Sequence, residues 1–282
     1  TDLTIATGQT LRVIGAGAVE TSPGGTTRVE GTLNLENGAL LANGPLEIDG
    51  TAGTTAQLLI GDSALSVANG GFVEAGTISI GSLGSFGVSG ATFEFRDDSL
   101  LTGTGPASLG GAPIAITGAG NGFTFDINQV VSNTAFGGTG NMTITGNLGI
   151  TGTSSFAGSI TAGAGGTLRT ATIGTTPTTF TVGTLGTTTG GTIQISGSAG
   201  STITVTDAPL LLNDGTLEAS GSLLTLDVSA FGLAAQNTAI VDVQGELTLN
   251  TGPSDFTLQD SSLLIRGSGD LLASGTGGLS ST

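Results

Sequence analysis

A short unit recurs along the whole chain: one glycine followed by alternating polar and apolar residues. It stands at residues 31–35 (GTLNL), 76–80 (GTISI), 191–195 (GTIQI) and 245–249 (GELTL). Alternation with a period of two is typical of β-strands, whose successive side chains point to opposite faces. Asn-Gly and Asp-Gly pairs, which favour tight turns, separate many of these runs. The pattern predicts an all-β chain, in which Ser229–Ala239 is the best candidate for a helix.

Two all-β architectures fit short strands separated by glycine turns: a sandwich or barrel, and a solenoid of parallel strands. The repeat continues without a linker, and the chain contains neither the Trp nor the Tyr that sandwich cores recruit. Small and aliphatic inward residues suit coils that stack about 4.8 Å apart. We therefore predict one right-handed parallel β-helix over residues 1–282, with a loose C-terminal tail at 274–282. The expected number of coils is about 12–13, with roughly 20–24 residues in each.

Residues 174–196 read GTTPTTFTVGTLGTTTGGTIQIS, and they illustrate how a stretch rich in Gly and Thr fits such a coil. We expect Val182, Leu185, Ile193 and Ile195 to point inward, with Phe180 filling a corner. The threonines are expected to form outward ladders, because β-branched side chains fit a pleated surface. The glycines then make the corners.

Residues 30–49 (EGTLNLENGALLANGPLEID) and 215–228 (GTLEASGSLLTLDV) resemble the right-handed parallel β-helix of autotransporter passengers and filamentous adhesins. The likeness covers most of the chain as a pattern of strands and turns, and no single motif carries it. Those families are secreted, so the resemblance implies an extracellular or cell-surface location. It also implies a role in adhesion, biofilm or display.

Several residue types are missing from the sequence. There is no Cys, His, Trp or Tyr, and the basic residues are all arginines: Arg12, Arg28, Arg96, Arg169 and Arg266. Disulfides, zinc sites built on Cys or His, Ser–His–Asp catalysis and lysine Schiff bases therefore cannot form. We expect no enzymatic activity and no cofactor.

The chain is strongly acidic, with a formal net charge of −16 and a pI near 4.1. A nucleic-acid partner needs a basic surface, which a few scattered arginines do not supply. No run approaches the roughly 18 apolar residues of a membrane-spanning helix, so we expect no membrane insertion. The acidity favours solubility, and surface carboxylates can also bind calcium without a dedicated site.

The acidic residues are unevenly distributed. Between Ile127 and Thr206 the only charged side chain is that of Arg169. This neutral segment is either ordinary core with outward threonines or a surface for lateral contact between subunits.

Three pairs of acidic residues are candidates for glycoside hydrolysis, which needs two carboxylates about 5–10 Å apart. The pairs are Asp97 with Asp98, Asp207 with Asp214, and Asp255 with Asp260. Turn capping or plain solvation of these acids is the favoured interpretation, because His, Lys, Trp and Tyr are absent. Residues 137–145 (GGTGNMTIT) approach the calcium-binding β-roll repeat, but Met142 stands where that repeat has an Asp ligand.

The two ends of a solenoid expose unpaired backbone groups, which isolated solenoids cover with polar caps. Here strand-like alternation reaches both ends, and neither offers an amphipathic capping helix. The candidate residues of an assembly interface are Leu3, Ile5, Leu11, Val13, Leu263, Leu264, Ile265, Leu271 and Leu272. Compatible open ends predict head-to-tail stacking into a filament, with a second copy of the chain as the partner. The alternative is an adhesin stalk or passenger fragment, whose caps belong to a longer parent protein.

Overall fold

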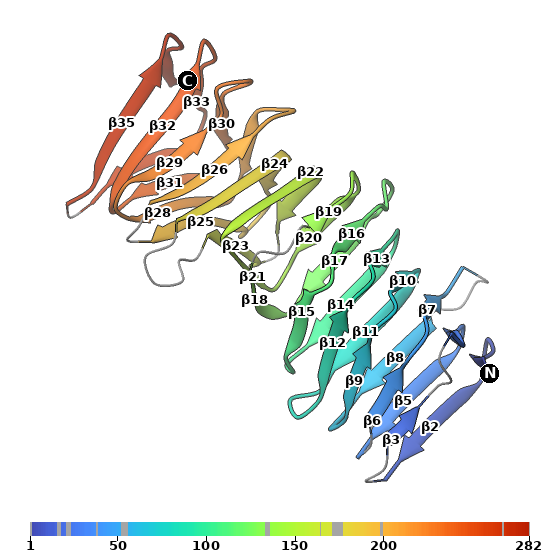
Figure 1. The fold of residues 1–282 in the computed structure, drawn as a ribbon. Coiled ribbons are helices and arrows are strands. Elements are labelled where there is room, and N and C mark those ends of the chain that lie inside the picture. Colours follow the sequence, from blue (N-terminus) through green and yellow to red (C-terminus); the bar gives the residue numbers. More distant parts are fainter. Residues whose placement is uncertain are drawn as a thin grey trace. The chain divides into compact units, whose positions relative to one another are not determined.

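The computed structural model describes residues 2–281 apart from 16–17, 21–23, 38, 52–55, 133–135, 164, 171–176, 198–199 and 267 (Figure 1). The chain divides into two compact units, unit 1 (Thr1–Asn141) and unit 2 (Met142–Thr282). Parallel strands stack in coils that form a β-solenoid of about 11 turns, and the described residues contain no helix. The predicted all-β parallel solenoid is therefore confirmed. That it forms a single domain stays a prediction.

Strands of successive coils in unit 1 line up in three parallel sheets, called faces A, B and C. Face A consists of β1 (Leu3–Ile5), β4 (Thr27–Val29), β7 (Leu46–Asp49), β10 (Gly71–Glu74), β13 (Phe93–Phe95), β16 (Ile114–Ile116) and β19 (Phe136–Gly137). Face B consists of β2 (Thr10–Ile14), β5 (Thr32–Glu36), β8 (Ala56–Ile60), β11 (Gly76–Ile80), β14 (Ser99–Gly103) and β17 (Phe123–Asp126). Face C consists of β3 (Ala18–Glu20), β6 (Ala39–Ala42), β9 (Ala64–Val67), β12 (Ser85–Ser89) and β15 (Ala107–Gly111). Along the chain, β18 (Asn128–Ser132) and β20 (Asn141–Ile144) lie near the boundary between the units.

Unit 2 also has three faces, called D, E and F. Face D consists of β21 (Asn147–Thr151), β23 (Thr167–Thr170), β25 (Thr192–Gly197), β28 (Thr216–Gly221), β31 (Ile240–Val243) and β34 (Ser262–Ile265). Face E contains β26 (Ser201–Val205), β29 (Leu224–Asp227), β32 (Glu246–Gly252) and β35 (Asp270–Gly275). Face F contains β27 (Leu210–Asn213), β30 (Leu233–Gln236), β33 (Phe256–Leu258) and β36 (Leu279–Ser281). The long strands β22 (Thr153–Ala162) and β24 (Thr178–Thr187) belong to both E and F.

Coils differ in length because the turns between their strands differ. The separation of paired residues along the chain ranges from 19 residues, between Thr27 and Leu46, to 26 residues, between Thr153 and Thr179. The longer turns use more residues per coil, so the solenoid has about 11 turns. The expected number of about 12–13 coils was too high for this reason.

Inward residues of neighbouring coils stack in rows that form the core. On face B, Leu33, Leu58, Ile78, Leu101 and Phe125 follow one another in register, and each is 0% exposed. Residues between these positions point outward, as the alternation in the sequence predicts. Each inward side chain thus packs against its counterparts in the coils before and after it.

Phenylalanines fill much of the core of unit 1, in place of the missing Trp and Tyr. The rings of Phe86, Phe93, Phe95, Phe123 and Phe125 form a continuous chain of contacts. Phe95 and Phe123 stack with ring centroids 4.1 Å apart, whereas the other contacts are edge-to-face. Aromatic pairs in these geometries stabilise a core beyond the effect of burial alone.

The inward residues predicted for the stretch 174–196 are confirmed within its described part. Val182, Leu185, Ile193 and Ile195 are each 0% exposed. Phe180 is buried as well, but it lies within β24, opposite Ile203, and not at a corner. The prediction of a corner was wrong because β24 pairs with β26 on both sides of Phe180, from Thr178 to Val182, and passes to face F only after Val182.

The predicted threonine ladder is present on face E. Thr153, Thr179, Thr202, Thr225 and Thr248 occupy successive coils in register on the outer side of the sheet. Their side chains are exposed or half-buried. β-Branched side chains suit this position because they pack well on a pleated surface.

The helix considered at Ser229–Ala239 does not form. Residues 233–236 are β30, in which Leu233 and Ala235 are buried. Positive φ angles at Gly232 (85°), Asn237 (54°) and Thr238 (68°) bound the strand on both sides. A right-handed helix cannot accommodate these angles, so the segment turns, extends and turns again.

Candidate assembly surfaces

The last coil of unit 2 carries core-type residues that no further strand covers within the described chain (Figure 1). Leu263, Ile265 and Leu271 lie in inward rows, since their register partners in the coil before are all buried. Ile265 is 54% exposed, whereas its register partner Val243 is 0% exposed. This coil is therefore an open layer of core positions.

Two of the predicted interface residues in this coil point outward. Leu264 is in register with Asp242, which forms an ion pair with Arg266 at 3.0 Å. Leu272 is in register with Thr248 and is 62% exposed. Both leucines therefore extend outward rows that are polar in the preceding coil.

Leu279 is an end-coil residue that the sequence reasoning missed. It belongs to β36, where it is 65% exposed and in register with the buried Phe256. The predicted loose tail at 274–282 contains this strand, and β36 pairs with β33 over three residues. The alternation of polar and apolar residues could not identify this strand, because Leu279 is its single large apolar residue.

The first coil of unit 1 also carries core-type residues that no further strand covers within the described chain. Leu3, Ile5, Leu11 and Val13 all occupy inward rows, in register with buried residues of β4 and β5. Ile5 is 3% exposed, and the other three are half-buried. A hollow at this edge is lined by Leu3, Thr4, Ile5, Gln9, Thr10 and Leu11. Three of the four predicted residues, Leu3, Leu11 and Val13, thus remain partly exposed at this edge, whereas Ile5 is buried.

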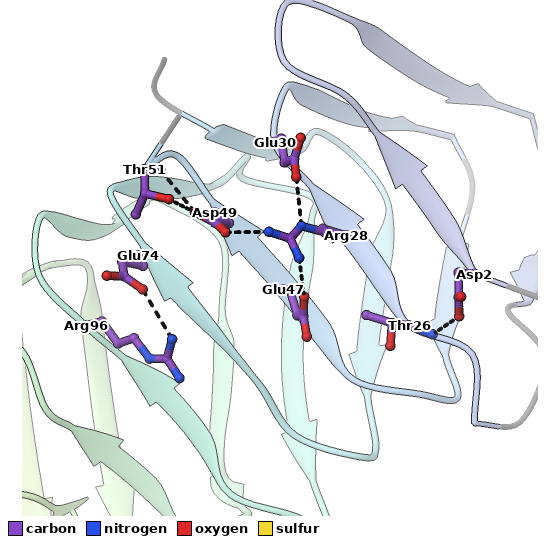
Figure 2. Close-up of polar contacts among 9 residues, drawn as sticks. All are labelled: Asp2, Thr26, Arg28, Glu30, Glu47, Asp49, Thr51, Glu74 and Arg96. Atoms are coloured by element: carbon purple, nitrogen blue, oxygen red, sulfur yellow. Dashed lines mark hydrogen bonds and ion pairs between the residues drawn. The ribbon is translucent and has the colours of Figure 1, made fainter. Parts of the chain in front are cut away.

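The outer side of face A is charged and differs from these apolar edges. Arg28 lies among three carboxylates, at 2.8 Å from Glu30, 3.5 Å from Glu47 and 2.8 Å from Asp49 (Figure 2). Asp49 also accepts hydrogen bonds from the hydroxyl and the N–H of Thr51, at 2.5 and 3.1 Å. The Thr51 hydroxyl above all, together with Arg28, holds the pKa of Asp49 below its ordinary value.

A second arginine, Arg96, forms ion pairs in the next coils of face A. Arg96 is 2.6 Å from Glu94 and 3.2 Å from Glu74, and its guanidinium lies 4.0 Å from the ring centroid of Phe72 (the pair with Glu74 is drawn in Figure 2). Partly exposed ion pairs of this kind contribute little individually. The arginines offset the repulsion between the acids that neighbouring coils place side by side on one sheet.

The candidate acid pairs cap turns or bond to neighbouring polar groups. Asp97 accepts hydrogen bonds from the N–H groups of Gly120 and Gly122, at 2.8 and 3.1 Å. Asp98 accepts one from the Asn121 amide at 2.6 Å, and Asp255 accepts one from the Gly278 N–H at 2.9 Å. The remaining contacts join Asp207 with Thr206 and Asp214 with Thr238, and the Asp260 carbonyl accepts from the Thr238 N–H.

The described residues contain no group of three or more His, Cys, Asp or Glu side chains that could hold a metal ion. In the segment that approaches a β-roll repeat, Met142 is 2% exposed and points into the core. Calcium binding by surface carboxylates, without a dedicated site, stays a prediction. In the part of the chain that the structure describes, no helix has the length and apolar character needed to cross a membrane.

No protein-family model and no curated protein matches this sequence.

Proposed function

We propose that the chain is a structural subunit that assembles head to tail through its end coils into an extracellular or cell-surface filament. The observation that supports this most is the open layer of core positions in the last coil, where Ile265 is 54% and Leu279 is 65% exposed. The first coil offers a second such surface, formed by Leu3, Leu11 and Val13.

Two forces favour contact between these surfaces. The free edges of β35 and β2 offer N–H and C=O groups, which another strand can pair as it does inside the chain. Complete burial of a Leu or Ile side chain contributes about 1.5–3 kcal/mol, so the remaining burial of Ile265 and Leu279 contributes about 1–2 kcal/mol each. A contact between two different surfaces can repeat from copy to copy, and it produces a filament when the rotation between copies does not close a ring.

The charge distribution agrees with growth at the ends. The outer side of face A carries five carboxylates, Glu30, Glu47, Asp49, Glu74 and Glu94, against the two arginines Arg28 and Arg96. With a net charge of −16, two copies repel each other side by side. The resemblance to autotransporter passengers and filamentous adhesins supports the location, and the absence of Lys leaves trypsin-like proteases few sites.

The test compares two charge substitutions. Ile265→Asp places a carboxylate in the open core row, whereas Leu83→Asp changes a turn residue that is 81% exposed and serves as the control. We expect the parent chain and Leu83→Asp to form fibres by negative-stain electron microscopy and to sediment as large species. Ile265→Asp is expected to stay monomeric with an unchanged circular dichroism spectrum.

Fibres of Ile265→Asp that match those of the parent chain would refute assembly through the last coil. A parent chain that stays monomeric at all concentrations would instead favour the adhesin stalk or passenger fragment.

A further inference from the structure

The first and last coils have matching geometry. Their inward positions, defined by register with the neighbouring coil, occur at the same spacings along the first two strands. These positions are 3, 5, 11 and 13 in the first coil, and 263, 265, 271 and 273 in the last. In the third strand, residue 19 pairs with Leu40 of the next coil, and residue 279 pairs with Phe256 of the coil before. Each residue number in the last coil equals the number of its counterpart in the first coil plus 260.

The coils beside the terminal coils do not share this spacing. The last inward residue of the first strand and the first inward residue of the next are six residues apart in both end coils, but four apart in the coils beside them. The pairs are Ile5–Leu11 and Ile265–Leu271 at the ends, and Val29–Leu33 and Val243–Leu247 beside them.

The turns of the two coils agree as well. The Gln9 N–H donates to the Ala6 carbonyl at 2.9 Å, and the Gly269 N–H donates to the Arg266 carbonyl at 2.9 Å, again at an offset of 260. At the end of the second strand, glycine with a positive φ occurs at equivalent positions, 121° at Gly15 and 137° at Gly275. The backbones of the two coils thus follow the same path through two strands and their turns.

We infer that the first coil of a second copy docks on the last coil as if it were the next turn of the same solenoid. Strand β1 pairs with β34, β2 with β35 and β3 with β36, each in parallel and with residue n opposite residue n + 260. This inference rests on the proposed function, since it specifies the register of the end-to-end contact. It continues the ladder that already joins β31 with β34 and β32 with β35.

Charges at the docked edges are complementary in this register. Asp270 lies opposite Glu246 in its own chain, which places two acids side by side at the free edge. In the docked copy, Thr10 stands opposite Asp270, and Arg12, which forms an ion pair with Glu36 of its own chain, follows two residues later on the same side of the strand. Docking lets Arg12 interact with Asp270 in addition to Glu36. The stem of Arg12 then covers Leu272, which is 62% exposed.

Cysteine cross-linking tests the register directly, because the chain has no Cys of its own. Two singly substituted proteins, Thr4→Cys and Leu264→Cys, are mixed, allowed to assemble and oxidised. Directly opposite residues in paired strands are about 4.8 Å apart at their Cα atoms, within the range of a disulfide. The control mixes Thr4→Cys with Ser262→Cys, a shift of two residues that separates the Cα atoms by more than about 7 Å.

We expect a reducible species of twice the chain's mass in the Thr4→Cys and Leu264→Cys mixture, and only a trace in the control and in each protein alone. Fibres whose cross-link appears in the shifted mixture, or in neither, would overturn the register while leaving end-to-end assembly intact. An absence of assembly in the parent chain would overturn both proposals.

Discussion

Replacing Phe95 by Ala tests whether the phenylalanine rows hold unit 1 together. Phe95 is 0% exposed, stacks on Phe123 at 4.1 Å and meets Phe93 edge-on at 5.4 Å. Truncation of a buried Phe removes its transfer free energy and leaves a cavity, at about 3–5 kcal/mol in total. Because two aromatic contacts of about 0.5–1.5 kcal/mol each are also lost, we expect a cost at the upper end of that range.

The assay is urea unfolding followed by far-ultraviolet circular dichroism, since the chain has no Trp to report by fluorescence. Phe231→Ala is the matched control, because Phe231 is 48% exposed and its truncation should cost less than about 1 kcal/mol. Phe95→Leu, which keeps most of the volume, should fall between the two. Equal midpoints for Phe95→Ala and Phe231→Ala would refute the assignment of Phe95 to a packed core.

Three further outcomes are expected. Gly221→Ala should destabilise unit 2 by more than about 2 kcal/mol in urea unfolding, because φ is 150° and a Cβ would lie 2.1 Å from the Gly197 carbonyl oxygen. Gly8→Ala, at a φ of 75° with no atom within 4 Å of the new Cβ, should cost only about 1–2 kcal/mol. The pKa of Asp49 is lowered in the folded state, so its contribution to stability is complete above the ordinary value of 3.8. That contribution is lost as the pH falls through the pKa that Asp49 has in the folded state. An Asp49→Asn variant should therefore lack this part of the pH dependence of the urea unfolding midpoint.

Much of the core was predictable from alternation alone. Val182, Ile193 and their counterparts are inward because every second residue of a strand faces the same side. The phase of that alternation is ambiguous where apolar residues are adjacent, as in Ser262–Ile265 (SLLI). In this strand, pairing of Leu263 and Ile265 with Val241 and Val243 determines which residues face the core, and it places the Leu264 side chain on the outer side.

Turn lengths were less predictable than strands. A strand is recognised from its own residues, whereas a turn is fixed by the coils above and below it. The positive φ angles of Gly232, Asn237 and Thr238 are an example. These residues flank β30 and precede β31, and the register of both strands is set by pairing with the preceding coil. The equivalence of the two end coils was hidden for the same reason, since it emerges only when inward positions are assigned through pairing.

Register between coils also governs how a chain of this kind can change in length during evolution. Loss of residues 216–239 would bring β31 against β25, with Val241 beside Ile193, both of which already occupy the same inward row. Loss of one residue inside a strand would instead exchange inside and outside for the remainder of that strand. Viable relatives should therefore differ by whole coils, gained or lost by duplication and deletion, and their lengths should fall into discrete steps.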